Sequence, residues 1–254
     1  MAESQEKKTV LLIADISGYT AFMVSNAQEL FHAQTIITEL VKAVIKEVKI
    51  PLKIAKLEGD AVFFYADKSK FVDWDKQCQK IRDKIDRFFI VFSRRLAELK
   101  HSETCKCGAC TNIDQLALKI IIHAGVVLFY KIGRFAELSG PAVILLHRLL
   151  KNSVPAREYV LLTEQALAEL NYPHKDFPLT AGVENYDLGQ IKTFVHYPPK
   201  ELTVILTPDL VAYYRSPISK IKNKIAKMMT MLKLSFTQKR NFAHLTPIAA
   251  GFKK

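Results

Sequence analysis

The order of apolar patterns along the chain is the feature that most constrains its fold. Residues 9–15 form an apolar, β-branched run that predicts a buried strand. Residues 21–49 lack Gly and Pro and carry apolar side chains at helical spacing, which predicts a long amphipathic helix. A hairpin over 53–66, a second helix over 75–99 and a strand over 116–129 complete a β-α-β-β-α-β series. This series predicts an α+β fold with a ferredoxin-like core sheet and helices packed on one of its faces.

The alternation of strands and helices continues beyond that core. Residues 133–140 predict a loop or a strand tip, and a helix over 141–150 begins at a proline, which is favoured in a first turn. A strand over 160–163 ends at Thr163, whose hydroxyl can cap a helix that runs to residue 170. A last hairpin turns at Gly189.

The charge is concentrated at one end of the chain. The net charge is +12, and residues 200–254 contribute +9 of it through eleven basic and two acidic side chains. We therefore expect a domain over 1–199, with a cysteine-bearing insertion at about 101–114, followed by a basic helical tail over 200–254. Because the body is almost balanced in charge, a nucleic-acid partner is not needed to explain the basic composition.

The first residues and the apolar runs favour a cytoplasmic location. Residues 1–8 are polar and charged, unlike a secretory signal, and the longest apolar runs are too short to span a bilayer. The four cysteines are then expected as thiols or metal ligands, since structural disulfides are rare in the cytosol.

Two aspartates stand at expected strand ends beside glycine turns. Asp15 closes the first strand shortly before Gly18, and Asp60 follows Gly59 in the first hairpin. Carboxylates on neighbouring strand ends can hold a pair of divalent cations, which an enzyme needs to grip a nucleoside triphosphate. The alternative is that both are ordinary turn residues, because Asp beside Gly is common in turns.

Four motifs, in order along most of the first 200 positions, resemble those of class III nucleotide cyclases, which make cyclic AMP or cyclic GMP. They are Ala-Asp-Ile-Ser-Gly-Tyr-Thr at 14–20, Lys-Leu-Glu-Gly-Asp at 56–60, the strand at 119–125 ending in His123-Ala124-Gly125, and the helix framework Gly140-x-x-Val143 with Arg148-Leu149. The resemblance implies a metal-dependent enzyme that cyclises ATP to cyclic AMP in signal transduction.

The resemblance also implies a role for each matching residue. Two Mg²⁺ or Mn²⁺ ions would be held by Asp15, the carbonyl of Ile16 and Asp60; Lys56 and Glu137 would read the purine base, and Arg148 would stabilise charge at the α-phosphate. A homodimer is implied, in which one protomer gives the aspartates and the other gives Lys56, Glu137 and Arg148. From the residues alone, the alternative for Lys56, Glu137 and Arg148 is that they are solvated surface groups, and His123 is expected to be a packed, hydrogen-bonded histidine.

Three departures from the cyclase pattern favour a second hypothesis. Ile144 stands where the family carries a transition-state asparagine, and Glu137 is one methylene longer than the usual aspartate. The turn before Gly189 reads Tyr-Asp-Leu where a triphosphate-binding lysine is expected, and Lys192 comes only after the turn. The alternative is therefore a catalytically inactive cyclase-homology module that binds nucleotide or mediates dimerisation or regulation.

A cysteine-rich loop follows the second long helix. His101, Cys105, Cys107 and Cys110 supply three thiolates and an imidazole, a set that can bind Zn²⁺ tetrahedrally. The spacing does not match a standard zinc knuckle, so a redox-active or unligated surface loop remains the alternative. Cys78 lies elsewhere, on a polar stretch of helix.

The basic tail contains one amphipathic pattern. Its apolar side chains recur every three or four residues, with lysines between them: Ile218, Ile221, Ile225, Met228 and Leu232. Such a helix can dock its apolar face on its own domain or a partner, leaving the lysines solvated. It can also make peripheral contact with an anionic membrane.

Overall fold

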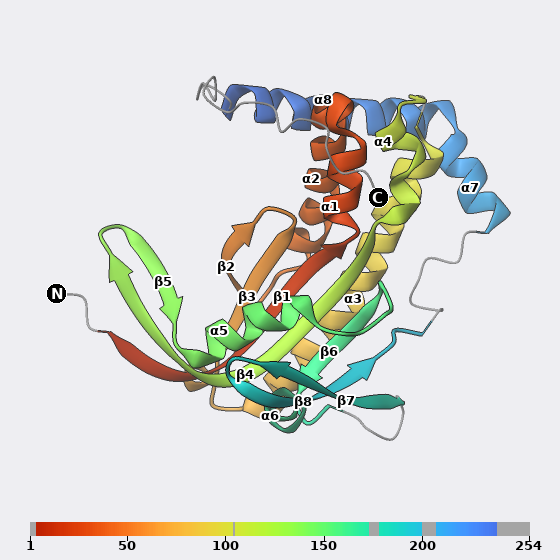
Figure 1. Ribbon diagram of the computed structural model, residues 1–254. Helices are drawn as coiled ribbons and strands as arrows, with labels where there is room; N and C mark the ends of the chain where they lie inside the picture. The colour runs from red at the N-terminus through yellow and green to blue at the C-terminus, as the bar shows by residue number, and fades with distance from the viewer. Residues whose placement is uncertain (1–3, 104, 173–177, 200–206, 238–254) are drawn as a thin grey trace.

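Eight strands form one sheet in the computed structural model, which describes residues 4–103, 105–172, 178–199 and 207–237 (Figure 1). The strands are β1 (Gln5–Ser17), β2 (Lys53–Glu58), β3 (Ala61–Asp67), β4 (Ala117–Ile132), β5 (Phe135–Ser139), β6 (Tyr159–Thr163), β7 (Leu179–Tyr186) and β8 (Gly189–His196). The helices are α1 (Tyr19–Ser25), α2 (Leu30–Lys46), α3 (Trp74–His101), α4 (Gly108–Thr111), α5 (Pro141–Arg148), α6 (Glu164–Glu169), α7 (Pro208–Arg215) and α8 (Pro217–Thr237).

The ferredoxin-like core expected from the sequence is present. The strand order is β2-β3-β1-β4-β6-β8-β7, with β5 paired to β4. Within the core, β1 pairs antiparallel with both β3 and β4, so the first strand lies at its centre. Beyond the core, β4 pairs parallel with β6, and the β7–β8 hairpin closes the sheet at that edge.

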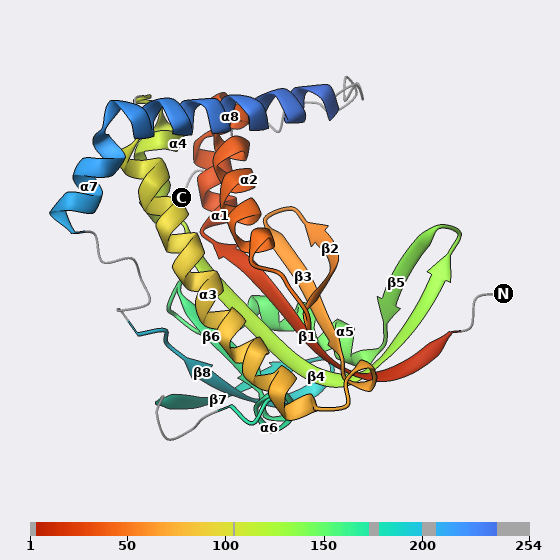
Figure 2. The same cartoon turned by 180° about the vertical axis from the view of Figure 1, so that it is seen from behind.

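Helices cover both faces of the sheet, whereas the sequence pattern led us to expect them on one. Side chains alternate along β1, so Val10 and Leu12 pack in the core beneath α2 and α3, and Leu11 and Ile13 pack on the opposite side with Leu146 of α5. Figures 1 and 2 show α5 and α3 on opposite sides of the sheet. Because β1 is apolar on both faces, each face needs a covering helix.

The helix expected over 21–49 is interrupted. It divides at Asn26 into α1 and α2, with a short helical turn at Ala27–Glu29 between them. Asn26 is buried, and its side-chain amide donates a hydrogen bond of 2.7 Å to the Phe22 carbonyl. An asparagine side chain that bonds nearby backbone competes with the helical pattern, which accounts for the break.

Two other local expectations have different outcomes. Residues 135–139 form the strand β5, which extends β4 into a long hairpin, rather than only a loop. The cap at Thr163 is confirmed, because its hydroxyl accepts a hydrogen bond of 3.2 Å from the Ala166 amide at the start of α6.

Helix α8 docks on the domain with the face opposite to the one expected. It lies across the ends of α2 and α4 in both views (Figures 1 and 2). Over residues 217–234 its buried side chains are Ser219, Asn223, Lys227 and Thr230, whereas the apolar row of Ile218, Ile221, Ile225, Met228 and Leu232 is 45–76% exposed. The expectation that the lysines are solvated is therefore wrong for Lys227.

Polar contacts explain why the polar face of α8 is the one that docks. Glu39 of α2 accepts a hydrogen bond from Thr230, and Arg95 of α3 lies 2.5 Å from the same carboxylate. Lys42 donates a hydrogen bond of 2.5 Å to Thr230. A surface that presents buried charges needs polar partners, and the polar face of α8 supplies them. Among the described helices, none combines the length and the apolar character needed to cross a membrane.

Candidate active site and metal-binding clusters

The pairing of β1 brings the two aspartates together. Ala14 of β1 lies opposite Val62 of β3, so the β2–β3 turn that carries Asp60 reaches the end of β1 that carries Asp15. On the other side, Asp15 lies opposite Lys119 of β4, and the Lys119 Nζ is 3.1 Å from the Asp15 Oδ2. The sequence motifs contain both aspartates, and the antiparallel registers place them in one site with a lysine.

This aspartate site is polar and open. Asp15, Asp60, Lys119 and the turn at residues 16–21 line a pocket of about 400 Å³. Burial, followed by the negative charge of Asp15, raises the pKa of Asp60 to about 7. One lysine cannot balance two neighbouring carboxylates, so the pair favours a proton or a cation. The carboxylates offer oxygen atoms, which hard divalent cations prefer as ligands, and Ile16 also lines the pocket.

A second pocket brings together Lys56 and Glu137. It has a volume of about 270 Å³ and lies between β2, β3 and the β4–β5 hairpin. Tyr65 and Phe129 line it, with ring centroids 5.4 Å apart in an edge-to-face contact. The Lys56 ammonium forms an ion pair of 3.0 Å with Glu58. Aromatic surface beside one donor and one acceptor is suited to a flat heterocycle.

Helix α5 carries the residues that depart from the cyclase pattern. Ile144 is 50% exposed, and Arg148 lies one turn later on the same face. The Arg148 Nη2 is 2.9 Å from the Asp187 Oδ2 in the β7–β8 turn, and both side chains are more than half exposed. Lys192 pairs instead with Glu164 at 3.4 Å. A carboxylate therefore faces the arginine where the family pattern would place a further cation.

His123 and Gly125 have structural roles. The His123 Nδ1 lies 2.9 Å from the Thr163 hydroxyl, and burial lowers the pKa of this histidine to about 4. A Cβ added to Gly125 would lie 2.8 Å from the Cβ of Ala142, so the glycine lets α5 approach the sheet. The expectation of a packed histidine at position 123 is consistent with these contacts.

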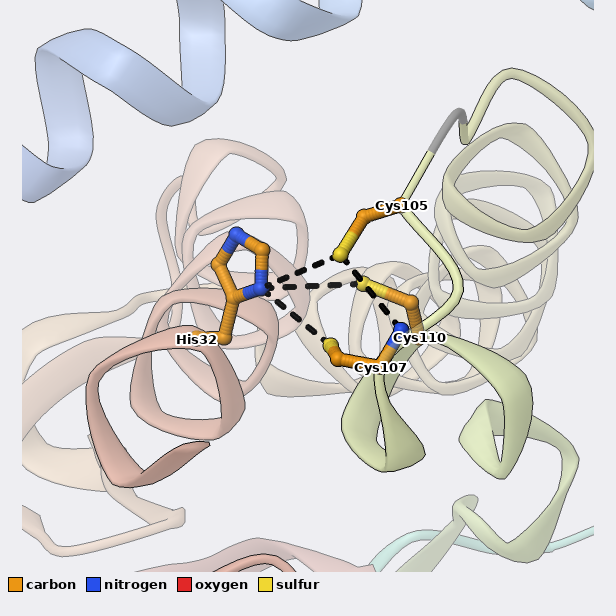
Figure 3. A group of neighbouring side chains, drawn as sticks. All are labelled: His32, Cys105, Cys107 and Cys110. Atoms are coloured by element: carbon orange, nitrogen blue, oxygen red, sulfur yellow. Dashed lines mark hydrogen bonds between the residues drawn. The ribbon is translucent and has the colours of Figure 1, made fainter. Parts of the chain in front are cut away.

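The three loop cysteines form a cluster with a histidine that the sequence reasoning missed (Figure 3). The fourth member is His32 at the start of α2, and the ligand atoms of His32, Cys105, Cys107 and Cys110 all lie within 4.8 Å of one another. His101, which the loop spacing suggested, is not in the cluster. It is the last residue of α3, where burial and the nearby Lys100 and Arg215 lower its pKa.

Comparisons of the sequence with known proteins find relatives whose function is not established. A family model described as a protein of unknown function, DUF2652, matches residues 37–159. An uncharacterized protein of Mycobacterium tuberculosis is 36% identical over 126 residues, which is 50% of this chain and 56% of that relative. The match thus spans little more than half the length of the relative.

Solved structures of nucleotide cyclases superpose on most of the chain. The adenylyl cyclase CyaB from P. aeruginosa is 16% identical, covers 78% of this chain and 97% of its own, and gives a TM-score of 0.55. The guanylate cyclase domain of RhGC from Catenaria anguillulae, solved in complex with GTP, is 13% identical, covers 77% of this chain and 100% of its own, and gives a TM-score of 0.51. The chain therefore has a divergent class III adenylyl or guanylyl cyclase fold.

Proposed function

We propose that this protein binds a purine nucleoside triphosphate, together with divalent cations, at sites shared by two protomers. The observation that carries the proposal is that one chain has two pockets of different chemistry that share no lining residue. The aspartate pocket (Asp15, Asp60) is polar, and the Lys56–Glu137 pocket is lined with aromatic rings. A triphosphate needs the first chemistry and a base needs the second, so a homodimer would complete each site with one pocket from each chain.

Asp15, Asp60 and the Ile16 carbonyl would hold Mg²⁺ or Mn²⁺, and the bound ions would neutralise phosphate charge. In the other protomer, the Lys56 ammonium would donate to a base nitrogen or oxygen. The Glu137 carboxylate would accept a hydrogen bond from the amino group of adenine, and Tyr65 and Phe129 would contact its rings. This arrangement of one donor and one acceptor favours ATP over GTP.

Binding is the main role that we propose, with cyclisation to cyclic AMP as a slow activity. Ile144 offers no hydrogen bond to a reacting ribose, and Asp187 already pairs with Arg148. Loss of one transition-state donor typically costs on the order of 10²–10³ in rate, so turnover would be reduced rather than abolished.

Calorimetry with ATP and Mn²⁺ tests the proposal. We expect Asp15→Ala to abolish ion-dependent binding of ATP, whereas Asp83→Asn, at an exposed carboxylate on α3, leaves it unchanged. ATP binding that is the same with and without the ion, or that survives Asp15→Ala, would contradict the aspartate site. Product analysis on the same samples measures cyclic AMP.

Mixing variants tests whether the site is shared. Asp15→Ala and Lys56→Ala proteins would each bind ATP poorly as homodimers. After dissociation and random reassociation, half of the dimers would be mixed, and each mixed dimer would hold one intact site, which restores roughly a quarter of the wild-type sites. No recovery in a sample proven to contain mixed dimers would show that the pockets do not act together.

A second candidate function concerns membrane contact through α8. The apolar row, from Ile218 to Leu232, faces away from the domain, and the flanking Lys222 and Lys224 are exposed. Exposed apolar and basic side chains on one helix are typical of binding to anionic lipid surfaces. We expect co-sedimentation with phosphatidylserine vesicles that weakens with salt and is lost in Ile221→Asn/Ile225→Asn. Equal sedimentation of wild type and variant would overturn it. The cytoplasmic location and the role in signalling stay predictions.

A further inference from the structure

The cysteine–histidine cluster has the dimensions of a metal site. The His32 Nδ1 lies 3.3 Å from the Cys107 Sγ, 3.8 Å from the Cys105 Sγ and 4.0 Å from the Cys110 Sγ. For tetrahedral zinc, with Zn–S of about 2.3 Å and Zn–N of about 2.0–2.1 Å, neighbouring N and S ligands are about 3.6 Å apart. The observed distances bracket this value, and Figure 3 shows the four side chains converging on one point.

The type of ligand selects the type of metal. All four cysteines of the chain are free thiols in the structure, so the three in the cluster are available for coordination. Thiolate with imidazole is a donor set for zinc, whereas magnesium and calcium require oxygen ligands. Four protein ligands leave no open coordination position, which is typical of a structural rather than a catalytic zinc site.

A buried lysine beside the cluster supplies the charge that a metal complex of this kind needs. Zinc with three thiolates and a neutral imidazole carries a net charge of −1. Lys227 of α8 is 6% exposed, and its Nζ lies 3.9 Å from the Cys110 Sγ. It also forms an ion pair with Glu103, in the segment that leads into the loop. Glu103 compensates the burial of this lysine. The same ammonium, 3.9 Å from the Cys110 sulfur, would also offset the negative charge of a zinc–thiolate complex.

We propose that His32, Cys105, Cys107 and Cys110 bind one Zn²⁺ ion with a structural role. The ion would link the insertion after α3 to the first turn of α2. The resulting anionic centre would attract the ammonium of Lys227 in α8. This proposal is independent of nucleotide binding, since none of the four ligands lines the aspartate pocket or the Lys56–Glu137 pocket.

Elemental analysis of the full-length chain tests the site. After purification without metal-affinity resins and under reducing conditions, we expect about one zinc per chain. His32→Ala should reduce the zinc content at least tenfold after dialysis. His101→Ala and Cys78→Ser are matched controls, since they remove a histidine and a cysteine outside the cluster, and both should retain the metal.

A measurement on the unaltered protein guards against variants that fail to fold. Stepwise titration of the wild-type thiols with a mercurial should release zinc as three thiols react. Substitution by Co²⁺ should give the visible absorption of a tetrahedral thiolate complex. Purified protein with free thiols that neither contains nor takes up zinc would overturn the proposal. So would loss of zinc in His101→Ala but not in His32→Ala, or an intact mass that shows a disulfide between loop cysteines.

Discussion

The aspartate pocket and the cysteine–histidine cluster are two candidate metal sites of opposite character. The first has carboxylate and carbonyl oxygens around an open pocket of about 400 Å³. The second has three sulfurs and a nitrogen within 4.8 Å of one another, covered by a helix that buries Lys227 beside them. An open oxygen site can exchange ions and admit a phosphate, whereas a closed sulfur site can only hold its ion. We therefore propose that the first site binds ligands and that the second stabilises the fold.

The two regions are nevertheless in contact. A Cβ added to Gly18, three residues after Asp15, would lie 2.3 Å from the Gln115 carbonyl, just beyond the cysteine insertion. A Cβ added to Gly108, inside the insertion, would lie 2.6 Å from the side-chain oxygen of Asn26. The insertion therefore packs against the turn and the helix that follow Asp15.

The largest effect should come from loss of the cluster. We expect Cys107→Ser, or treatment of the wild type with a strong zinc chelator, to lower the free energy of unfolding by about 4 kcal/mol or more, because structural metal binding contributes directly to folding. Asp15→Ala should cause no such loss, since the relieved repulsion with Asp60 offsets the lost ion pair with Lys119. Urea unfolding measures the stability of both variants. Equal destabilisation by the two substitutions would contradict a structural role that is specific to the cluster.

A smaller effect is expected from restoring a polar group on α5. Ile144→Asn supplies a hydrogen-bonding side chain where the cyclase pattern has one, and we expect cyclic AMP formation to rise by about 10². Ile144→Val is the matched control and should leave the rate unchanged. Mass spectrometry of the products with Mn²⁺ and ATP measures both. An unchanged rate in the asparagine variant would indicate a binding module without turnover.

The contact between the two regions can be broken at Gly18. Gly18→Ala forces a Cβ against the Gln115 carbonyl at a φ of +86°, and we expect a loss of about 2 kcal/mol in stability with weaker ATP binding. Gly59→Ala, at a φ of +69° with open space around its Cβ, should cost only about 1 kcal/mol. Denaturant unfolding and calorimetry distinguish them. Equal losses at the two positions would mean that the support from the insertion is unimportant.

The smallest expected effect is a pH dependence of ion binding at the aspartate pocket. The pKa of Asp60 is raised to about 7, so below that pH the carboxyl holds a proton that an ion must displace. We expect Mn²⁺ affinity to fall about tenfold per unit as the pH drops below 7, and to level off above it. Calorimetry in buffers of different ionisation enthalpy would detect the released proton. Asp60→Asn should remove the dependence, and a constant affinity in the wild type between about pH 6 and 7 would contradict it.

Local patterns in the sequence were sufficient for most of the fold. The β-α-β-β-α-β series and the cap at Thr163 depend on periodicity and on contacts within a few residues, and both are present. The break at Asn26 was missed, because the surrounding apolar spacing continues through it and only a side-chain bond to the Phe22 carbonyl reveals the competition.

By itself, the sequence determined the cyclase-like core, the aspartate pair and the three loop cysteines. Each of these features depends on residues that are close together in the chain or that belong to a motif. Only the tertiary structure decided which distant residues contact these features. His32 lies 73 residues before Cys105, and no spacing rule links them, whereas His101 is near in sequence but is not part of the cluster. The exposure of the apolar row of α8 also depends on tertiary contacts. Amphipathic spacing identifies two faces of the helix, but the polar face docks because it contacts the charged side chains of Glu39 and Glu103.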